Sequence, residues 1–458
     1  MTKRTKTSAH ELTAAPELKR RIASVLRLAR LAGADEAEVQ IDETIDALTR
    51  FANNAVHQNV AEKGLTISVR TVVDGRTSRV TTNRLDEDSL RAAVESSLQL
   101  AASQPKIAGL LPVPGPQRYR KVNRVSRETA EVTPEDRARA VRKASDLAIR
   151  NGQVAAGIFS TGQSQLALGN SRGLFAAYRN THAEFSITMQ DEGAASWAKA
   201  NACNVRDFDP QGLAVRASEK ARMARQPQEL APGKHTVILE PAAVLDLVGF
   251  LFYDFSATAV EDQRSCLTGR LGKPLFGNNI SISDDAYHPL QMGAPFDGEG
   301  LPRQQVALVR EGVPRNLVYS RSSARKAGKK PTGHGFALPN EYGEAPMNLV
   351  FGGGKSSVEE MVASTDRGLL VTRVWYIREV DPYEKVMTGM TRDGLFLVEN
   401  GKVVSSVRNF RFNQSLIDLL RNVVALGPPR RTTAEEAFEM VVPAMKVTGF
   451  HFTEPTKF

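Results

Sequence analysis

The strongest constraint on the fold is a pattern that occurs twice in the first half of the chain: a helical period, strand-like alternation, and a second helical period. Residues 17–32 carry apolar side chains at every third or fourth position, and residues 36–42 alternate between polar and apolar side chains. The dipeptide Asp74-Gly75, typical of β-hairpins, precedes a helical period that resumes near Asp86. These signals predict an N-terminal domain, residues 17–104, built as helix, antiparallel sheet and helix.

A proline-rich stretch, residues 105–130, predicts a linker between this domain and the next. Thr133-Pro134-Glu135-Asp136 then combines an N-cap residue, a proline at the first helical position and early acidic charge, which predicts the start of a helix. The predicted elements that follow are strands at Leu166–Leu168, Phe175–Tyr178 and Glu184–Met189 and a helix at about 211–225. We therefore expect a central domain, residues 131–228, with the same order of elements, as a distant internal duplication would produce.

The remainder, residues 233–455, is predicted to be a larger, strand-rich C-terminal domain. A strand at His235–Glu240 precedes a mostly apolar helix, Pro241–Phe252, and the run Ser356-Ser357-Val358-Glu359-Glu360 offers a capping box for a short helix. The other predicted elements are strands at Arg303–Val309, Leu317–Tyr319, Gly368–Ile377, Met440–Val442 and Val447–Phe452, a hairpin at Leu395–Arg408 and a helix at Ser415–Leu426. Because helices and antiparallel strands are segregated, the predicted fold class is α+β: two small helix–antiparallel-sheet–helix units followed by the larger domain.

Composition excludes several classes of protein. The 458 residues are 41% hydrophobic and 24% charged, as in globular proteins, and two cysteines, Cys203 and Cys266, exclude a disulfide framework. The net charge of +9 would suit acidic partners, but none of the basic clusters lies in a nucleic-acid-binding module. These clusters are Lys3, Arg4 and Lys6, then Arg325, Lys326, Lys329 and Lys330, then Arg430 and Arg431. Because no apolar segment is long enough for a secretory signal or a membrane span, we expect a soluble, cytoplasmic protein.

Two glycine motifs could carry chemistry. The run Gly352-Gly353-Gly354-Lys355-Ser356 resembles the end of a phosphate-binding loop, but Leu349 stands where such a loop requires its first glycine. We interpret the run as a flexible or closely packed backbone loop. The segment Gly169-Asn170-Ser171-Arg172-Gly173 matches the G-x-S-x-G pattern of serine hydrolases, but the residues after it read as a strand rather than a helix. We predict that it forms a hairpin tip.

Histidines give no local sign of a zinc site. None of the seven lies within five positions of another, whereas hydrolytic zinc sites commonly use two histidines one helical turn apart. A site assembled from distant residues stays open, with His334 in the loop Thr332-Gly333-His334-Gly335 as its most exposed candidate.

Three longer blocks of the sequence carry a family resemblance. Thr49–Asn59 followed by Gly64–Arg70 is similar to the N-terminal signature of the TldD/PmbA family, sometimes called putative modulators of DNA gyrase. Pro295–Pro302 is similar to the central fDxEGxp block of that family. Ser357–Met361 and Arg367–Thr372 resemble the C-terminal block, so the similarity runs from about residue 20 to 453. The resemblance implies a cytoplasmic peptidase whose working form is a dimer of a TldD-type and a TldE/PmbA-type chain. Unfolded peptides enter the enclosed cavity and are cut at a zinc site, an H-E-x-x-x-H helix with a later cysteine, on the TldD-type chain.

This sequence departs from that zinc motif. Residues 241–265, which correspond to the zinc-binding helix, contain no histidine, and no cysteine follows Cys266. Four carboxylates in this segment could hold a hard cation weakly: Asp246, Asp254, Glu261 and Asp262. Its large apolar side chains are predicted to pack in the interior: Leu245, Val248, Phe252 and Phe255. The chain ending, with Val442–Met445 and Phe450–Thr453, is more similar to the PmbA side of the family.

The resemblance and the missing motif together predict a non-catalytic TldE/PmbA-type subunit with neither catalytic residues nor a metal of its own. We expect a heterodimer with a zinc-bearing TldD-type chain, or a homodimer, that acts on unfolded peptides and contacts neither membrane nor nucleic acid. Gly352, Gly353 and Gly354 are candidate peptide-binding residues, because glycines permit close approach of another backbone. Two alternatives stay open: a divergent metallopeptidase that is active by itself, and a DNA-associated regulator.

Overall fold

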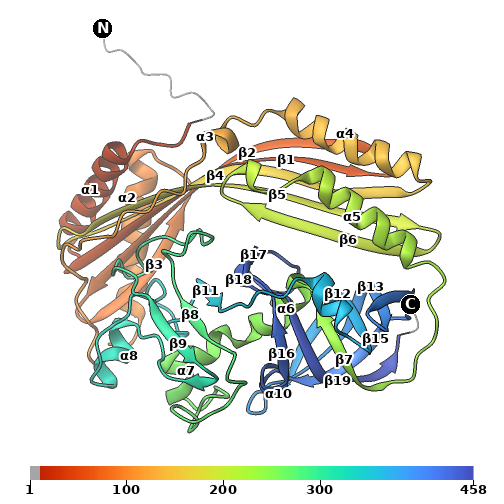
Figure 1. The fold of residues 1–458 in the computed structure, drawn as a ribbon. Helices are drawn as coiled ribbons and strands as arrows, with labels where there is room; N and C mark the ends of the chain where they lie inside the picture. Colours follow the sequence, from red (N-terminus) through yellow and green to blue (C-terminus); the bar gives the residue numbers. More distant parts are fainter. Residues whose placement is uncertain (1–10, 457–458) are drawn as a thin grey trace.

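The computed structural model describes residues 11–456 and confirms the α+β class. Figure 1 shows two layers: a long sheet with helices on its outer face, and a strand-rich C-terminal part beneath it. The basic cluster Lys3, Arg4 and Lys6 lies outside the described residues. Within residues 11–456, no helix is both long enough and apolar enough to cross a membrane.

The two small units share one six-stranded antiparallel sheet. The first unit comprises α1 (Ala15–Leu31), β1 (Glu36–Ala52), β2 (Ala55–Val73), β3 (Arg76–Thr82) and α2 (Glu87–Ser103). The second comprises α4 (Pro134–Arg150), β4 (Val154–Asn170), β5 (Phe175–Asp191), β6 (Ala194–Ala202) and α5 (Pro210–Met223), preceded by the short α3 (Arg127–Ala130). The strand order β3-β2-β1-β4-β5-β6 is symmetric about the β1–β4 pairing, and each half has the order helix, three strands, helix. This arrangement is the one that a duplication of the unit would produce.

Helices cover one face of this sheet and the C-terminal part faces the other. Ala144 of α4 and Ala217 of α5 pack with Phe159 and Phe185 of β4 and β5, and α1 and α2 pack on β1 and β2. On the opposite face, Leu168 contacts Phe296 of the C-terminal part. The outer helices therefore leave the inner face and the β6 edge to meet the C-terminal domain (Figure 1).

Local sequence signals were accurate where side-chain chemistry fixes the backbone. Thr133 and Asp136 form the full capping box of α4, and the carboxylate of Asp86 caps α2 by accepting from Ser89 N. Asp74 and Gly75 both have positive φ, as the predicted two-residue hairpin turn requires. The segment 170–173 is the tip of the β4–β5 hairpin, and Asn170 Oδ1 accepts from Arg172 N there.

The predicted central strands were too short. The runs at Leu166–Leu168, Phe175–Tyr178 and Glu184–Met189 lie inside two strands of 17 residues each. Their remaining positions carry polar residues such as Thr161 and Gln165, which hide the apolar alternation although both side chains are buried and hydrogen-bonded.

The C-terminal part contains two sheets. The first has the order β10-β9-β8-β11-β18-β17, and the second β12-β7-β19-β15-β13-β14; β16 also pairs with β19, and β12 with β13. Because of the β12–β13 pairing, the strands β12, β7, β19, β15 and β13 close into a barrel, filled by phenylalanines such as Phe410, Phe412 and Phe450. The strand bounds are β7 Gly233–Leu239, β8 Ile282–Asp284, β9 Val306–Arg310, β10 Val313–Pro314, β11 Leu349–Phe351, β12 Arg367–Asp381, β13 Val386–Glu399, β14 Lys402–Ser406, β15 Phe410–Ser415, β16 Val423–Leu426, β17 Arg430–Thr432, β18 Met440–Val442 and β19 Met445–Pro455.

The helices of this part are short; two of them were predicted too long, and one predicted strand nearby is a loop. They are α6 (Pro241–Val248), the 3₁₀ segment η2 (Gly249–Phe255), α7 (Ala257–Glu261), α8 (Arg321–Lys326), α9 (Val358–Ala363) and α10 (Leu416–Arg421). The helix predicted to Phe252 ends at Val248, where η2 begins. The helix predicted to Leu426 ends at Arg421, because the β-branched pair that follows joins β16 against β19. The predicted strand Leu317–Tyr319 is a loop with one isolated bridge, from Val318 to Ser256.

Candidate functional site

The candidate site is the space along the outer edge of β6. Within residues 11–456, β6 pairs on one side only, with β5. Ala194 and Ala195 line a cavity of about 710 Å³, and residues 197–200 line a second cavity of about 270 Å³. At the right of Figure 1, β6 is the strand of the upper sheet that lies nearest to α6 and β12. An edge strand therefore runs along two cavities between the layers.

The two tryptophans of the chain stand at these cavities. Trp197 lines the smaller cavity and Trp375 the larger one. The guanidinium of Arg373 lies over both rings, 4.8 Å from the centroid of Trp197 and 5.4 Å from that of Trp375. Its Nε donates to Asp393 Oδ2 at 2.6 Å, and both charged side chains are buried. This stacked cation links the two layers between the cavities.

Ion pairs hold the β6 side against the C-terminal part. Lys199 of β6 lies 3.3 Å from Glu184 and 3.4 Å from Glu435. Lys220 of α5 contacts Glu240 at 2.5 Å, just before α6. Because these lysines are largely buried, the pairs are screened less than surface pairs, and they link β6 and α5 to the C-terminal part.

The helix that faces this space, α6, is buried and nearly all apolar. Its one ionisable side chain, Asp246, is fully buried, and its Oδ1 accepts from Glu436 N at 2.8 Å and from Glu435 N at 3.2 Å. Its other oxygen, Oδ2, is buried with no hydrogen-bond partner. Burial raises the pKa of Asp246 to about 7, although the two N–H groups and Arg373 act in the opposite direction.

A covering segment, residues 434–438, lies over α6 and η2. Phe438 packs edge-on against Phe252 at 5.2 Å between ring centroids. A Cβ at Gly249 would lie 2.3 Å from Ala437 Cβ, so the absence of a side chain at Gly249 permits this contact. The segment therefore occupies the surface of the helix that a metal or a substrate would have to reach.

The residues of α6 and η2 do not fit the zinc site that the resemblance implies. Asp246 is engaged with the covering segment, and Asp254 is buried in an ion pair with Lys385 at 2.6 Å. Burial raises the pKa of the Cys266 thiol well above its ordinary value, which disfavours the thiolate form that binds zinc. In the part of the chain that the structure describes, no three His, Cys, Asp or Glu side chains gather as metal ligands. The donor set at this helix consists of two occupied carboxylates and no imidazole.

The prediction that His334 is exposed was wrong. Its ring is fully buried, with Nε2 2.9 Å from Asp284 Oδ1 and Nδ1 2.9 Å from Thr332 Oγ1. Burial alone would raise the pKa of Asp284, but His334 holds it below its ordinary value. Asp284 Oδ2 also accepts from Asn348 N at 2.7 Å, so the pair connects the end of β8 to two loops rather than forming an accessible site.

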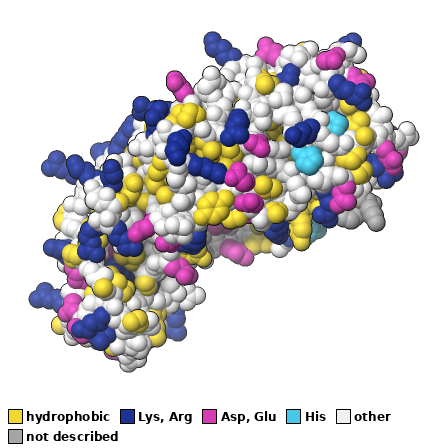
Figure 2. All heavy atoms as spheres, turned by 90° about the horizontal axis from the view of Figure 1, so that it is seen from below, with side chains coloured by type: hydrophobic (Ala, Val, Ile, Leu, Met, Phe, Trp, Pro, Cys, Tyr) yellow, Lys and Arg dark blue, Asp and Glu magenta, His cyan; other side chains and the backbone are white. Residues whose placement is uncertain are grey.

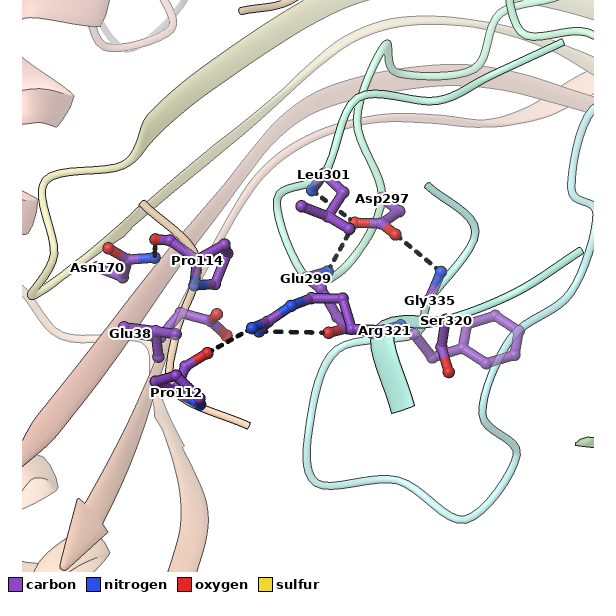
Figure 3. Close-up of polar contacts among 12 residues, drawn as sticks. Glu38, Pro112, Pro114, Asn170, Asp297, Glu299, Leu301, Ser320, Arg321 and Gly335 are labelled. Carbon is purple, nitrogen blue, oxygen red and sulfur yellow. Dashed lines mark hydrogen bonds and ion pairs between the residues drawn. The ribbon is translucent and has the colours of Figure 1, made fainter. Parts of the chain in front are cut away.

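The block Pro295–Pro302 also has a structural role. Figure 3 shows its two buried carboxylates between the N-terminal sheet and the loops that carry Ser320 and Gly335. Asp297 accepts from Glu299 N, Leu301 N and Gly335 N, and Glu299 Oε1 accepts from Arg321 N. Burial, followed by the charge of Asp297, raises the pKa of Glu299 to about 7. The buried carboxylates of the block therefore hold the start of α8 and the loop of Gly335 against it.

The glycine run 352–354 follows β11 and has an intramolecular explanation. A Cβ at Gly353 would lie 2.6 Å from Gly427 O, and one at Gly354 would lie 2.3 Å from Leu426 O. Gly354 N donates to Gly427 O at 2.8 Å. The closely packed loop was predicted; the backbone that approaches it is residues 426–429 of the same chain. The three glycines remain exposed, so contact with a peptide stays a prediction.

The basic clusters differ in their surroundings. Arg325 and Lys326 lie on α8, and Figure 2 shows Lys and Arg side chains interspersed with acidic and hydrophobic ones on the lower face. Arg431 is half-buried and donates to Asn201 Oδ1 and to Leu290 O. Sequence reasoning missed the edge of β6 and the position of Arg373 between Trp197 and Trp375. The sequence shows that the chain has two tryptophans, but not that the fold brings them together.

Comparisons with known proteins agree with this architecture. Models of the PmbA/TldA metallopeptidase family match residues 37–101 (domain 1), 127–225 (central domain) and 232–454 (C-terminal domain). An uncharacterized protein of Methanocaldococcus jannaschii is 24% identical over 84% of this chain and 88% of its own length. Metalloprotease PmbA of Escherichia coli O157:H7 is 24% identical over 70% of this chain and 71% of its own.

Solved structures share the fold. TldE from Thermococcus kodakarensis has a TM-score of 0.85 at 20% identity, with 95% of this chain and 100% of that chain covered. A putative modulator of a DNA gyrase from Thermotoga maritima has a TM-score of 0.82 at 22% identity, with the same coverage.

Proposed function

Since this chain belongs to the PmbA/TldD metallopeptidase family, we propose that it is a peptide-binding, non-cleaving subunit of the TldE/PmbA type. In this proposal it pairs with a TldD-type chain in a cytoplasmic complex that processes unfolded peptides. The partner supplies the zinc and the cleavage. The homodimer is the alternative assembly.

The observation that carries the proposal is the contrast between β6 and α6. The β6 edge lies beside two cavities, whereas α6 presents no imidazole and is covered by residues 434–438. The site therefore offers backbone and aromatic surface to a peptide, and α6 supplies no imidazole that could hold zinc beside it. In this proposal the site binds a peptide and the partner cuts it.

Strand addition to β6 would hold an extended peptide through its backbone. An edge strand offers unpaired N–H and C=O groups, which bind any extended chain independently of its sequence. The strand reads Ala-Ala-Ser-Trp-Ala-Lys-Ala-Asn-Ala, so few bulky side chains obstruct a neighbouring strand. The ion pairs of Lys199 and Lys220 hold the two layers together beside this strand, and in this proposal an extended chain enters the space between the layers.

The glycine run remains part of the proposal as a peripheral contact. Gly352, Gly353 and Gly354 are exposed and precede Ser356, which lines the smaller cavity. A peptide that leaves this cavity would pass the loop.

The two tryptophans provide the test of peptide binding. Titration with an unfolded peptide should change the fluorescence of the wild-type chain, because both indoles line the proposed groove. Trp197→Phe and Trp375→Phe, measured separately, assign the change to the smaller or the larger cavity, and a folded protein of similar composition is the control. Fluorescence that does not respond to unfolded peptide would refute binding along β6.

Co-expression tests the pairing. The chain should co-purify with a TldD-type protein of the same organism, and zinc should be found with that protein. Stoichiometric, chelator-sensitive zinc in this chain alone would instead support an active metallopeptidase. Duplex DNA binding below micromolar at physiological salt would support the DNA-associated regulator, which scattered charge does not favour.

A further inference from the structure

A third cavity, of about 360 Å³, lies where the linker passes the edge of β5. It is lined by linker residues 119–125, by Ala177, Tyr178 and Arg179 of β5, and by Pro295. Four of these residues are cationic, Arg120, Lys121, Arg124 and Arg179, and none is acidic. The two cavities beside β6 differ from this third cavity, because the lining of each of them includes carboxylates.

The cavity forms because β5 extends beyond its neighbour. Strand β6 pairs with residues 183–191 of β5 and leaves the stretch from Phe175 onward without a strand on that side. The linker meets this edge at one point, where Thr181 N donates to Arg124 O at 2.8 Å. Between Phe175 and Arg179 the edge of β5 stays open toward the cavity, and Ala177 there is exposed.

The four cations have no carboxylate partner. Among residues 11–456, none of them forms an ion pair, whereas Lys199 and Lys220 beside β6 each do. The Arg124 Nη groups donate to His288 O and Pro289 O, which are neutral acceptors. The Nε atoms of Arg124 and Arg179 are buried without any hydrogen-bond partner. A buried donor without a partner is costly, so these groups are suited to receive an anionic ligand.

The cavity continues the groove along β6. Cys203 follows β6 directly, and its Sγ donates to Arg124 O. Arg431 lines the smaller cavity and donates to Leu290 O, next to the two carbonyls that Arg124 holds. A peptide lying along β6 therefore reaches the cationic cavity at the end of that strand.

We propose that this cavity binds acidic side chains of the peptide, so that the chain selects unfolded peptides with a stretch of Asp or Glu. This inference rests on the proposed function and names the substrate class of that site. Peptide is favoured over nucleic acid because the aromatic rings are not free for base stacking. Tyr119 packs on Phe296 at 5.4 Å, and its hydroxyl donates to Gly300 O, while the Tyr178 hydroxyl donates to Met292 O.

The test compares two fluorescein-labelled unfolded peptides that differ only in a tail of four Glu or four Gln. Anisotropy measures binding anywhere on the chain, and tryptophan fluorescence reports the β6 groove. The wild-type chain should bind the Glu peptide about tenfold more tightly at low salt, and the preference should shrink as salt rises. The triple variant Arg120→Gln, Lys121→Gln, Arg179→Gln should bind both peptides with the affinity of the wild-type chain for the Gln peptide.

A matched triple variant controls for net charge. It combines three substitutions on the exposed face of α4: Arg142→Gln, Lys143→Gln and Arg150→Gln. This variant loses the same charge as the first one, and it should still prefer the Glu peptide. Equal affinity of the wild-type chain for both peptides would overturn the inference, and so would a preference for the Glu peptide that survives the first triple variant. In either case, tryptophan quenching by the peptides would still support binding in the β6 groove. Acid-specific anisotropy without quenching would support the cationic cavity and refute the groove. A duplex oligonucleotide that binds as tightly as the Glu peptide, with loss in the first triple variant, would overturn the assignment to peptide.

Discussion

Asp246→Asn should remove the decrease in the free energy of unfolding that the ionisation of Asp246 causes as the pH rises. In the folded chain burial raises the pKa of Asp246 to about 7, against an ordinary value of 3.8 for the unfolded chain. Because the folded-state pKa is the higher one, the protonated carboxyl stabilises the fold fully below pH 3.8, and this contribution is lost as the pH rises through about 7. The whole effect amounts to roughly 4 kcal/mol, of which roughly 3 kcal/mol falls between pH 5 and pH 8.

The amide variant keeps the contact but cannot ionise. The amide oxygen of the substituted side chain would still accept from the N–H groups of residues 435 and 436, so the covering segment should stay in place. The variant's buried amide N–H₂ group replaces an oxygen that has no partner, which costs about 1 to 3 kcal/mol at any pH. The free energy of unfolding of the variant minus that of the wild type should therefore rise by roughly 3 kcal/mol from pH 5 to pH 8.

Urea denaturation at pH 5, 6, 7 and 8 measures this difference. Subtraction of the wild-type value at each pH removes the contributions of other buried carboxylates such as Glu299, and Asp146→Asn on the exposed face of α4 controls for the amide substitution itself. A difference between Asp246→Asn and wild type that does not change with pH would refute the reasoning, since it would mean that Asp246 ionises equally easily in both states.

Three further changes test the buried network. Glu299→Gln should likewise flatten the fall in melting temperature between pH 5 and pH 8, because the raised pKa of about 7 makes the protonated acid the stabilising form; an unaltered pH profile would contradict this. Gly249→Ala places a Cβ 2.3 Å from that of Ala437, so we expect a loss of about 1 to 3 kcal/mol and faster proteolysis of the covering segment, whereas unchanged proteolysis would count against the contact. His334→Ala leaves Asp284 buried without its partner, which should cost on the order of 3 to 5 kcal/mol in chemical denaturation; a loss below about 1 kcal/mol would mean that the pair is not buried.

The helix starts and hairpin turns that local side chains determine were predicted from the sequence. Thr133 is the N-cap residue that was predicted, and it forms a complete capping box with Asp136. The capping box predicted within residues 356–360 is formed by Ser357 and Glu360. The hairpins at Asp74-Gly75 and Asn400-Gly401 have the positive φ values that their residues favour. In each case the atoms that decide the backbone lie within four residues of one another.

Features that depend on distant residues could not be predicted. The β1–β4 pairing joins residues more than a hundred positions apart, and nothing local in either strand specifies its partner. His334 looked accessible because glycines flank it, but Asp284, fifty residues earlier, draws it into the interior. The cationic cavity needs Arg179 from β5 beside three linker residues, and Tyr119 and Val122 interrupt the basic run that would have drawn attention to it.

The most direct test of the account is peptide hydrolysis by three preparations: this chain alone, the TldD-type protein alone, and the two mixed. We expect no cleavage by this chain alone, and cleavage of unfolded peptide by the mixture that chelators abolish. The same tryptophan response to peptide should appear with this chain alone and in the mixture. Chelator-sensitive cleavage by this chain in the absence of the other protein would contradict the central claim that it binds peptide without cutting it.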